Sequence, residues 1–288
     1  MRKNERAVAL GFFDGVHLAH RKVLSCAKRY ADSHGLIPAA VTFDRPPRAE
    51  KGGLIRTVRD RVSLMEESGI REVRVLPFDE TLRQTEPEDF LRQYVFGELS
   101  AAYCVAGFDY RFGREGRGNA ALLMALCREA GVVCEIVSPM EDGAGKLSST
   151  RIRELIACGA MEEVQEQLGL PYFFSGEVIH GKALGRTLGF PTMNVPIPEE
   201  LVLPRAGVYA CHLLLDGVEY RGVCNVAHGE RPLCEVYVFD YAGDAYGKAV
   251  RVSLLHFLRA MRPFPSWEAL REQVDFDKKM ARDWFISR

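Results

Sequence analysis

The spacing of apolar residues changes near residue 170, and this change is the strongest constraint on the fold. Up to that point strand-like apolar runs alternate with helical ones, as in residues 6–13 and then 19–34. Strands alternating with helices are typical of a parallel sheet with right-handed crossovers. Beyond residue 170 short apolar runs are separated by Asp-Gly and Gly-Asp turns. We therefore expect an α/β domain over 1–169, then a small antiparallel β-barrel over 170–288 that ends in a helix.

Local signals predict individual elements within this plan. Apolar spacing predicts further strands over 36–43, 73–76, 102–107 and 132–137, and helices over 57–69 and 120–130. A pair of helices around 151–168 is expected to join the two halves. Thr85-Glu86-Pro87-Glu88 has capping-box spacing, so a helix is expected to open there. Residues 207–215 followed by Asp216-Gly217 predict a hairpin. Ser266 is the expected N-cap of the final helix.

Composition excludes several classes of protein. The chain has 288 residues, of which 47% are apolar and 27% charged, and its net charge is −1. This balance gives no global attraction to nucleic acid or to an anionic membrane surface. Eight cysteines occur without a C-x-x-C pair, which favours buried thiols in a reducing compartment over zinc. No apolar stretch approaches the ~18 residues of a membrane span. We expect a cytoplasmic protein without nucleic-acid or membrane partners, and a homo-oligomer is compatible with the sequence.

Two histidines follow the first expected strand, in the run Gly11-Phe12-Phe13-Asp14-Gly15-Val16-His17-Leu18-Ala19-His20. Parallel α/β sheets bind ligands at the carboxyl ends of their strands, and a helix N-terminus there favours phosphate. Imidazoles three residues apart at that point can donate hydrogen bonds to phosphate oxygens. A pair of this kind is more often structural when it stands alone, but the flanking Gly11, Asp14 and Gly15 favour a binding site.

This run resembles the first motif of the HxGH nucleotidylyltransferase superfamily, and more narrowly the FMN adenylyltransferase half of bacterial bifunctional FAD synthetases. Residues 42–47, 107–119 and 148–153 match further motifs of that family. The resemblance implies a Rossmann-like domain in which His17, His20 and Arg153 are catalytic. It further implies ATP-binding residues, namely Gly11, Phe12, Asp14, Ser148, Ser149 and Thr150. The flavin-binding residues that it implies are Asp109, Arg111, Phe112 and Asn119.

A second phosphate motif occupies residues 181–194, Gly-Lys-Ala-Leu-Gly-Arg-Thr-Leu-Gly-Phe-Pro-Thr-Met-Asn. Glycines let backbone N–H groups approach an anion closely, and Arg186 adds a fixed positive charge in a fork that suits phosphate. Thr192 and Asn194 offer hard oxygen donors of the kind that Mg²⁺ accepts. The segment therefore predicts a site that holds nucleotide phosphates through a metal ion.

Residues 171–288 resemble riboflavin kinases along nearly their whole length, including 176–181, 207–209, 222–226, 235–237 and 243–248. The resemblance implies that Glu235 is the general base that deprotonates the 5′-hydroxyl of riboflavin. It assigns ATP binding to Gly181, Lys182, Gly185, Arg186 and Thr192. Thr192 and Asn194 would hold Mg²⁺. The hypothesis for the whole chain is a two-step enzyme that converts riboflavin and ATP to FMN, and FMN and a second ATP to FAD.

Two departures from the family patterns leave alternatives open. Ala19 stands where the HxGH motif has glycine, and its methyl group is expected to crowd the adenine base. The 226–234 loop is shorter than in riboflavin kinases and lacks the usual Pro-Thr. One alternative is therefore that only one of the two activities is retained. The other is a non-catalytic flavin-binding protein, against which the retention of His17, His20 and Glu235 argues.

Overall fold

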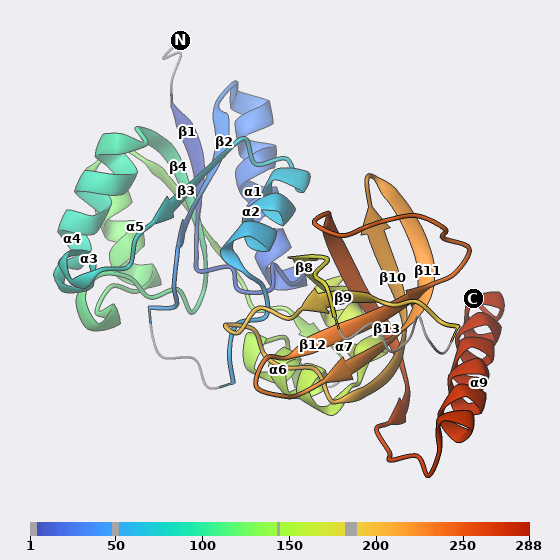
Figure 1. The fold of residues 1–288 in the computed structure, drawn as a ribbon. Coiled ribbons are helices and arrows are strands. Elements are labelled where there is room, and N and C mark those ends of the chain that lie inside the picture. Colours follow the sequence, from blue (N-terminus) through green and yellow to red (C-terminus); the bar gives the residue numbers. More distant parts are fainter. Residues whose placement is uncertain (1–4, 48–51, 143–144, 182–188) are drawn as a thin grey trace. The chain divides into compact units, whose positions relative to one another are not determined.

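The computed structural model describes residues 5–47, 52–142, 145–181 and 189–288 (Figure 1). Its contacts divide the chain into two compact units. The first comprises residues 1–51 and 58–149, and the second comprises residues 52–57 and 150–288. The boundary expected between residues 169 and 170 concerns the two catalytic domains, and it stays a prediction.

A five-stranded parallel sheet forms the centre of the first unit. Its strands are β1 (Arg6–Leu10), β2 (Ile37–Phe43), β3 (Glu72–Leu76), β4 (Ala101–Gly107) and β5 (Val133–Val137), in the order β3-β2-β1-β4-β5. Its main helices are α1 (Leu18–His34), α2 (Val58–Glu67), α3 (Glu80–Gln84), α4 (Pro87–Phe90) and α5 (Ala120–Glu129). Figure 1 shows α1 and α2 on one face of the sheet and α3, α4 and α5 on the other. The expected parallel α/β class is confirmed.

The strand order reverses between β1 and β4, and this reversal positions the first candidate site. The chain runs from β1 outward through β2 to β3, then crosses back to β4 on the opposite side of β1. Ala7, Val8 and Ala9 of β1 are fully buried, because β1 has a neighbouring strand on each edge and helices over both faces. The loops that leave β1 and β4 therefore separate and open a crevice between them.

The capping box expected at Thr85 is wrong. The short helix α4 has Glu86 at its N-cap position without a side-chain cap bond, and Pro87 is its first residue. Thr85 instead ends α3, and its hydroxyl donates to the carbonyl of Thr81. Proline at the first helical position is favoured because its missing N–H has no intrahelical partner anyway. The helix continues as a π-helical turn, Leu91–Glu98.

A curled six-stranded antiparallel sheet forms the second unit, as expected. Its order is β8 (Tyr172–Glu177), β13 (Ala249–Ala260), β10 (Gly207–Leu215), β11 (Val218–Ala227), β12 (Leu233–Val238) and β9 (Met193–Pro196). A bridge between Ile179 and Asn194 brings the two edge strands together. The hairpin predicted at Asp216-Gly217 is confirmed, and both residues have the positive φ of a type I′ turn. Helices α6 (Ser149–Cys158) and α7 (Met161–Leu168) precede the sheet.

The C-terminal helix α9 (Trp267–Ile286) packs against the outside of this sheet. Ser266 caps it as predicted, since its hydroxyl accepts from the N–H of Ala269 at 3.2 Å. Ala281 and Phe285 join a buried apolar cluster with residues of β10, β11 and β13. Nearer its start, buried Asp277 receives two hydrogen bonds from Arg259 of β13, at 2.8 and 2.6 Å. Apolar packing and one bidentate ion pair thus fix this helix to the sheet.

Two further observations on the described residues concern the class of protein. No helix among them combines the length and the apolarity that crossing a lipid bilayer requires. All eight cysteines are free thiols, and six of them are buried.

We expect Asp277→Ala to destabilise the second unit by about 3–5 kcal/mol, because it leaves the Arg259 guanidinium without its buried partner. Both tryptophans of the chain, Trp267 and Trp284, lie in α9, so tryptophan fluorescence during urea unfolding reports on this unit alone. Asp275→Ala is the matched control. It removes the ion pair between the exposed Asp275 carboxylate and Lys278 on the same helix and should cost less than about 1 kcal/mol. Equal effects would contradict the role of the buried pair.

Candidate active sites

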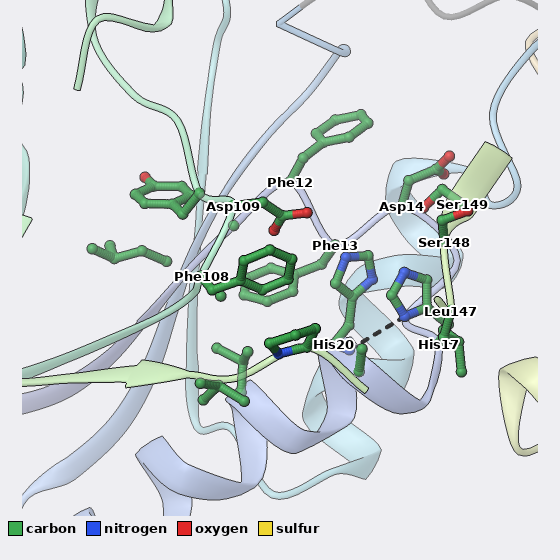
Figure 2. A pocket seen from close by; sticks show the side chains of 18 of the residues that line it. Phe12, Phe13, Asp14, His17, His20, Phe108, Asp109, Leu147, Ser148 and Ser149 are labelled. Carbon is green, nitrogen blue, oxygen red and sulfur yellow. Dashed lines mark hydrogen bonds between the residues drawn. The ribbon is translucent and has the colours of Figure 1, made fainter. Parts of the chain in front are cut away.

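The crevice between β1 and β4 contains a cavity of about 390 Å³. The loop after β1 contributes residues 10–14, and the start of α1 contributes His17, Ala19 and His20. The loop after β4 contributes residues 107–111, and residues 147–149 close a further side. Segments far apart in the sequence therefore meet around one cavity (Figure 2).

Two stacked imidazoles form its floor. The rings of His17 and His20 lie 3.6 Å apart between centroids, and their planes differ by 16°. His17 is the N-cap of α1, where its Nδ1 accepts from the backbone N–H of His20 at 3.3 Å (Figure 2). An accepting Nδ1 leaves the proton of the neutral ring on Nε2. The Nδ1 atom of His20 is buried and has no hydrogen-bond partner among the described residues.

Burial holds both rings neutral. Desolvation lowers the pKa of His17 to about 4, although the nearby Asp109 carboxylate opposes the shift. Desolvation lowers the pKa of His20 well below its usual value as well, with smaller contributions from His17 and Arg61. An anion in the cavity would favour the protonated forms, because an opposite charge stabilises imidazolium. The two imidazoles are therefore suited to become protonated when phosphate binds or when negative charge develops on it.

The loop between β1 and α1 turns sharply. Phe13 and Val16 have positive φ values of 55° and 47°, which non-glycine residues rarely adopt. Gly11 is required by packing, since a Cβ atom there would lie 2.8 Å from the Phe13 ring. These constraints give the loop its tight path, on which Phe12 and Asp14 line the cavity.

Arg61 of α2 supports this loop from behind, and sequence reasoning missed it. Its side chain is fully buried and donates to the carbonyl oxygens of Phe12 and Phe43, at 2.6 and 2.9 Å, and to the hydroxyl of Thr42 at 3.1 Å. Burial lowers its pKa to about 10, which leaves it charged at neutral pH. Its spacing from buried Leu64 and Met65 places it on the apolar face of the helix. An arginine among the apolar residues of a helix face is the sequence signal that could have identified it.

A second cavity, of about 350 Å³, adjoins the first and shares Phe43, Pro47 and Arg111 with it. Three phenylalanine rings and three arginine side chains contribute to its wall. Phe43 packs edge-on against Phe78, with 5.5 Å between centroids, and Phe112 also lines it. A flat aromatic ligand fits such a wall, because offset and edge-to-face ring contacts are favourable.

The predicted site residues of this half divide into two groups. Most line one of the two cavities, namely Gly11, Phe12, Asp14, His17, His20, Asp109, Arg111, Phe112, Ser148 and Ser149. Asn119 and Thr150 do not line either cavity. Asn119 caps α5, where its side chain accepts from the N–H of Leu122 at 2.9 Å. Arg153 belongs to the second unit, where its Nε donates to the carbonyl of Gly53 at 2.8 Å.

In the second unit, strand pairing sets up a row of side chains on one face of the sheet. Glu235 of β12 is paired with Asn194 of β9 on one side and with Asn225 of β11 on the other. The row continues through Val208 of β10 to Arg259 of β13. Directly paired residues point to the same face, so the Glu235 carboxylate stands between two amides. The Nδ2 of Asn225 donates to Oε2 of Glu235 at 3.2 Å.

Two cavities meet beside this row. The first, of about 260 Å³, is mostly apolar and is lined by Glu235, Asn225 and Arg259 together with Trp267, Leu270 and Val274 of α9. The second, of about 1,010 Å³, is lined by acidic and aromatic groups, including Asp240 and Asp244 and the stacked rings of His180 and Tyr246. Thr192 and Tyr237 line both. A ligand in one cavity can therefore approach a ligand in the other near Thr192.

Gly181 and Asn194 lie in close contact beside the row. A Cβ atom at Gly181 would overlap the Asn194 amide, so only glycine fits there, and Asn194 itself is buried. Lys182, Gly185 and Arg186 fall outside the described residues. The shortened loop in 226–234 is a hairpin connection between β11 and β12, in which the His228 ring contacts the carbonyl of Pro204 at 2.7 Å.

Sequence reasoning also missed residues that line the two cavities. His180, Tyr237 and Tyr246 lay within recognised motifs, but their ring contacts depend on the fold. Arg282 of α9 lines the larger cavity and stacks over the Phe239 ring at 4.7 Å. No local pattern distinguishes it from the other cations of that helix.

Comparisons with known proteins cover both units. Residues 1–151 match the FAD synthetase family and residues 168–285 match the riboflavin kinase family. The chain is 36% identical to the bifunctional riboflavin kinase/FMN adenylyltransferase of Bacillus subtilis, over 98% of this chain and 94% of that protein. Its identity to the protein of the same name from Haemophilus influenzae is 34%, with the same coverage. The crystal structure of a Streptococcus pneumoniae protein named macrolide-efflux protein superposes with a TM-score of 0.87, at 31% identity and over 97% of this chain and 95% of that one. With sequence similarity over nearly its full length and both catalytic family matches present, the chain belongs to the bifunctional riboflavin kinase/FMN adenylyltransferase family.

Proposed function

We propose that this chain makes FAD in two steps at two separate sites, one in a riboflavin kinase domain over 170–288 and one in an FMN adenylyltransferase domain over 1–169. The observation that carries the proposal is the Glu235 carboxylate, which stands in an apolar cavity that meets a polar one at Thr192. This arrangement suits a flat vitamin with one reactive hydroxyl and a nucleotide that approaches from the other side. The adenylyl step is supported by the His17–His20 pair and by an adjoining cavity that is lined by both phenylalanine and arginine side chains.

In the kinase step, Glu235 takes the proton from the 5′-hydroxyl of riboflavin as that oxygen bonds to the γ-phosphorus of ATP. The bond from the γ-phosphorus to the β-phosphate oxygen breaks, and ADP leaves. A carboxylate suits this role because it can accept a proton at the moment the nucleophile forms its new bond. The carboxylate lines the apolar cavity and accepts a hydrogen bond from the Asn225 amide. The glycine-rich segment with Gly181, Lys182, Gly185 and Arg186 would bind the phosphates of ATP.

The residues present fit Mg²⁺, which the phosphoryl transfer calls for. The Thr192 hydroxyl and the buried Asn194 amide are hard oxygen donors beside the junction of the two cavities. When bound, the ion neutralises charge on the phosphate oxygens. Asn194 is held against Gly181, so its side chain is oriented before any ligand arrives.

In the adenylyl step, a phosphate oxygen of FMN attacks the α-phosphorus of ATP, and the bond to the β-phosphate oxygen breaks to release pyrophosphate. This transfer needs positioning and charge neutralisation rather than a covalent nucleophile. His17 and His20 would donate hydrogen bonds to the phosphates, with Arg153, Ser148, Ser149 and Thr150 as further contacts. Gly11, Phe12 and Asp14 would hold the nucleotide, and Asp109, Arg111, Phe112 and Asn119 the flavin.

The remaining partners follow from this chemistry. Riboflavin, FMN and ATP are small-molecule substrates, and the net charge of −1 offers no general attraction to nucleic acid. Eight free thiols suit the reducing cytoplasm. Assembly into a homo-oligomer is compatible with this chemistry, because neither step as proposed needs a residue from a second copy of the chain.

The decisive experiment supplies each substrate separately. Purified protein is incubated with ATP, Mg²⁺ and either riboflavin or FMN, and the flavins are separated by chromatography. Formation of FMN and FAD from riboflavin, and of FAD from FMN, is expected. Activity with only one of the two flavins would identify a single retained activity. Flavin binding without any product would identify a flavin-binding protein, and the proposal would fall.

We expect Glu235→Gln to slow FMN formation by roughly 10²- to 10⁴-fold, because the amide cannot accept the proton. Conversion of FMN to FAD should stay near the wild-type rate, since that step uses the other site. Glu219→Gln, at an exposed position of β11, serves as the control and should leave both rates unchanged. An equal loss of both activities would contradict separate sites.

Ala19→Gly should lower the KM for ATP in the adenylyl step by roughly ten- to hundredfold, because Ala19 lines the cavity and its methyl group crowds the base. The KM for ATP in the kinase step should not change. Ser25→Gly, at an exposed position of the same helix, controls for the added backbone freedom. An unchanged KM in the adenylyl step would mean that the methyl group is accommodated.

Binding of ATP to the adenylyl site should take up protons at about pH 6. His17 is neutral there in the free protein, since its pKa is about 4, and a bound triphosphate raises that pKa toward the solution pH. The uptake should fade above about pH 8, where imidazole stays neutral in both states. Calorimetric titration in buffers of different ionisation enthalpy measures it. His17→Asn should reduce the uptake, whereas His34→Asn at the other end of α1 should not.

A further inference from the structure

Asn225 lies beside Glu235, the proposed base of the kinase site. Its amide has a donor end, Nδ2, and an acceptor end, Oδ1, and each has its own role at this site. We infer that Asn225 positions the Glu235 carboxylate through its Nδ2, and that its Oδ1 accepts a hydrogen bond from a hydroxyl of the sugar-alcohol chain of the flavin. The inference rests on the proposed kinase function and assigns one specific contact within it.

The first half of the inference rests on strand register. Asn225 of β11 is the direct antiparallel partner of Glu235 on β12, so the two side chains share one face of the sheet. The Nδ2···Oε2 distance of 3.2 Å is that of a hydrogen bond. The carboxylate accepts only, so the NH₂ end of the amide must face it. This fixes which way the Asn225 amide points.

The second half rests on the opposite end of the same amide. With Nδ2 turned to Glu235, Oδ1 is buried, and no described residue donates a hydrogen bond to it. A buried carbonyl oxygen without a donor costs about 1–3 kcal/mol. Such orphaned acceptors in native proteins call for a specific explanation. A ligand that brings its own donor would remove this penalty when it binds.

The residues that line the cavity around Asn225 limit the kinds of ligand that can bind there. Its other strongly polar members are already engaged, since Arg259 and Asp277 form a bidentate pair. The rest of the wall is largely apolar, with Val208, Met261 and Phe264 among its residues. A flat apolar ring system with hydroxyl groups along an attached chain matches this distribution. Because Asn225 adjoins Glu235, its acceptor faces the hydroxyl next to the reacting one rather than the ring.

This geometry gives Asn225 two separable effects on the reaction. Loss of the Nδ2 donor frees the Glu235 carboxylate to rotate, which lowers the turnover number, because misplacement of a reacting group by about 1 Å costs up to 10²-fold. Loss of the Oδ1 acceptor weakens recognition of one hydroxyl group. That second effect shows as a change in selectivity between riboflavin and an analogue that lacks the hydroxyl.

The test combines two variants with a series of substrates. Asn225→Asp keeps the shape and the acceptor but replaces the donor with a carboxylate oxygen that repels Glu235. Asn225→Leu removes both groups at similar volume. Each variant is assayed for FMN formation with riboflavin and with analogues that each lack one of the 2′-, 3′- or 4′-hydroxyls. FMN-to-FAD conversion in the same samples reports on the other unit.

With the wild-type protein, removal of one particular hydroxyl, expected to be the 4′ group, should lower kcat/KM about tenfold. Asn225→Asp should lower kcat for riboflavin about 10- to 100-fold and still discriminate against that analogue. Asn225→Leu should lower kcat similarly, and its kcat/KM should change less than about threefold when the hydroxyl is removed. Gln165→Glu and Gln165→Leu, at an exposed position of α7 in the same unit, make the matched side-chain changes and should leave all values unchanged.

The outcomes are distinct. If Asn225→Leu penalises every analogue by the same factor as the wild type, Oδ1 does not contact a substrate hydroxyl. If both variants keep the wild-type kcat, Asn225 does not position Glu235. Tryptophan fluorescence of α9 checks that each variant is folded, and Asn225→Asp still tests the positioning role if the leucine variant unfolds. A wild-type protein that forms no FMN at all would instead overturn the proposed function.

Discussion

Backbone pairing between strands decides where the polar side chains of the proposed kinase site lie. Three strands in antiparallel register bring Asn194, Glu235 and Asn225 into one line, although Asn194 lies far from the other two in the chain. A slip of one residue in any of these strands would turn its side chain to the other face of the sheet. The strand register therefore fixes the positions of these three side chains before any ligand binds. The close packing of Gly181 against Asn194 adds a second constraint at the end of the row.

The first unit uses a different device, the point where the order of parallel strands reverses. Loops leave β1 and β4 in opposite directions, and the crevice between them is lined by the start of α1. Desolvation keeps the rings of His17 and His20 neutral there, and the fully buried Arg61 anchors the loop that leads to them. The charged Arg61 lies behind the loop, and the neutral imidazoles lie in front of it. An anion that binds in the cavity would favour protonation of these imidazoles, which adds an attractive charge interaction.

Much of this arrangement could be predicted from the sequence, because the relevant signals are local. The spacing of apolar residues gave the two kinds of sheet, and Asp216-Gly217 and Ser266 gave a turn and a cap that the structure confirms. Where two local signals competed, the prediction was wrong. At Thr85 the capping-box spacing was overruled by Pro87, whose missing N–H and fixed φ place the helix start one residue later. The structure adds that the Asn119 side chain caps α5, and its flavin contact stays a prediction.

The sequence by itself determined the alternation of elements, the membership of two families and the residue types available for phosphate chemistry. Only the tertiary structure decided that Arg61 lies buried behind the loop that follows β1, that Asn225 hydrogen-bonds to Glu235, and that Arg282 of α9 reaches the larger cavity. The physical reason is the separation along the chain between the residues that interact. Turns, caps and amphipathic faces arise between residues a few positions apart, whereas these three contacts join segments whose closeness is set by strand register and by the packing of helices on sheets.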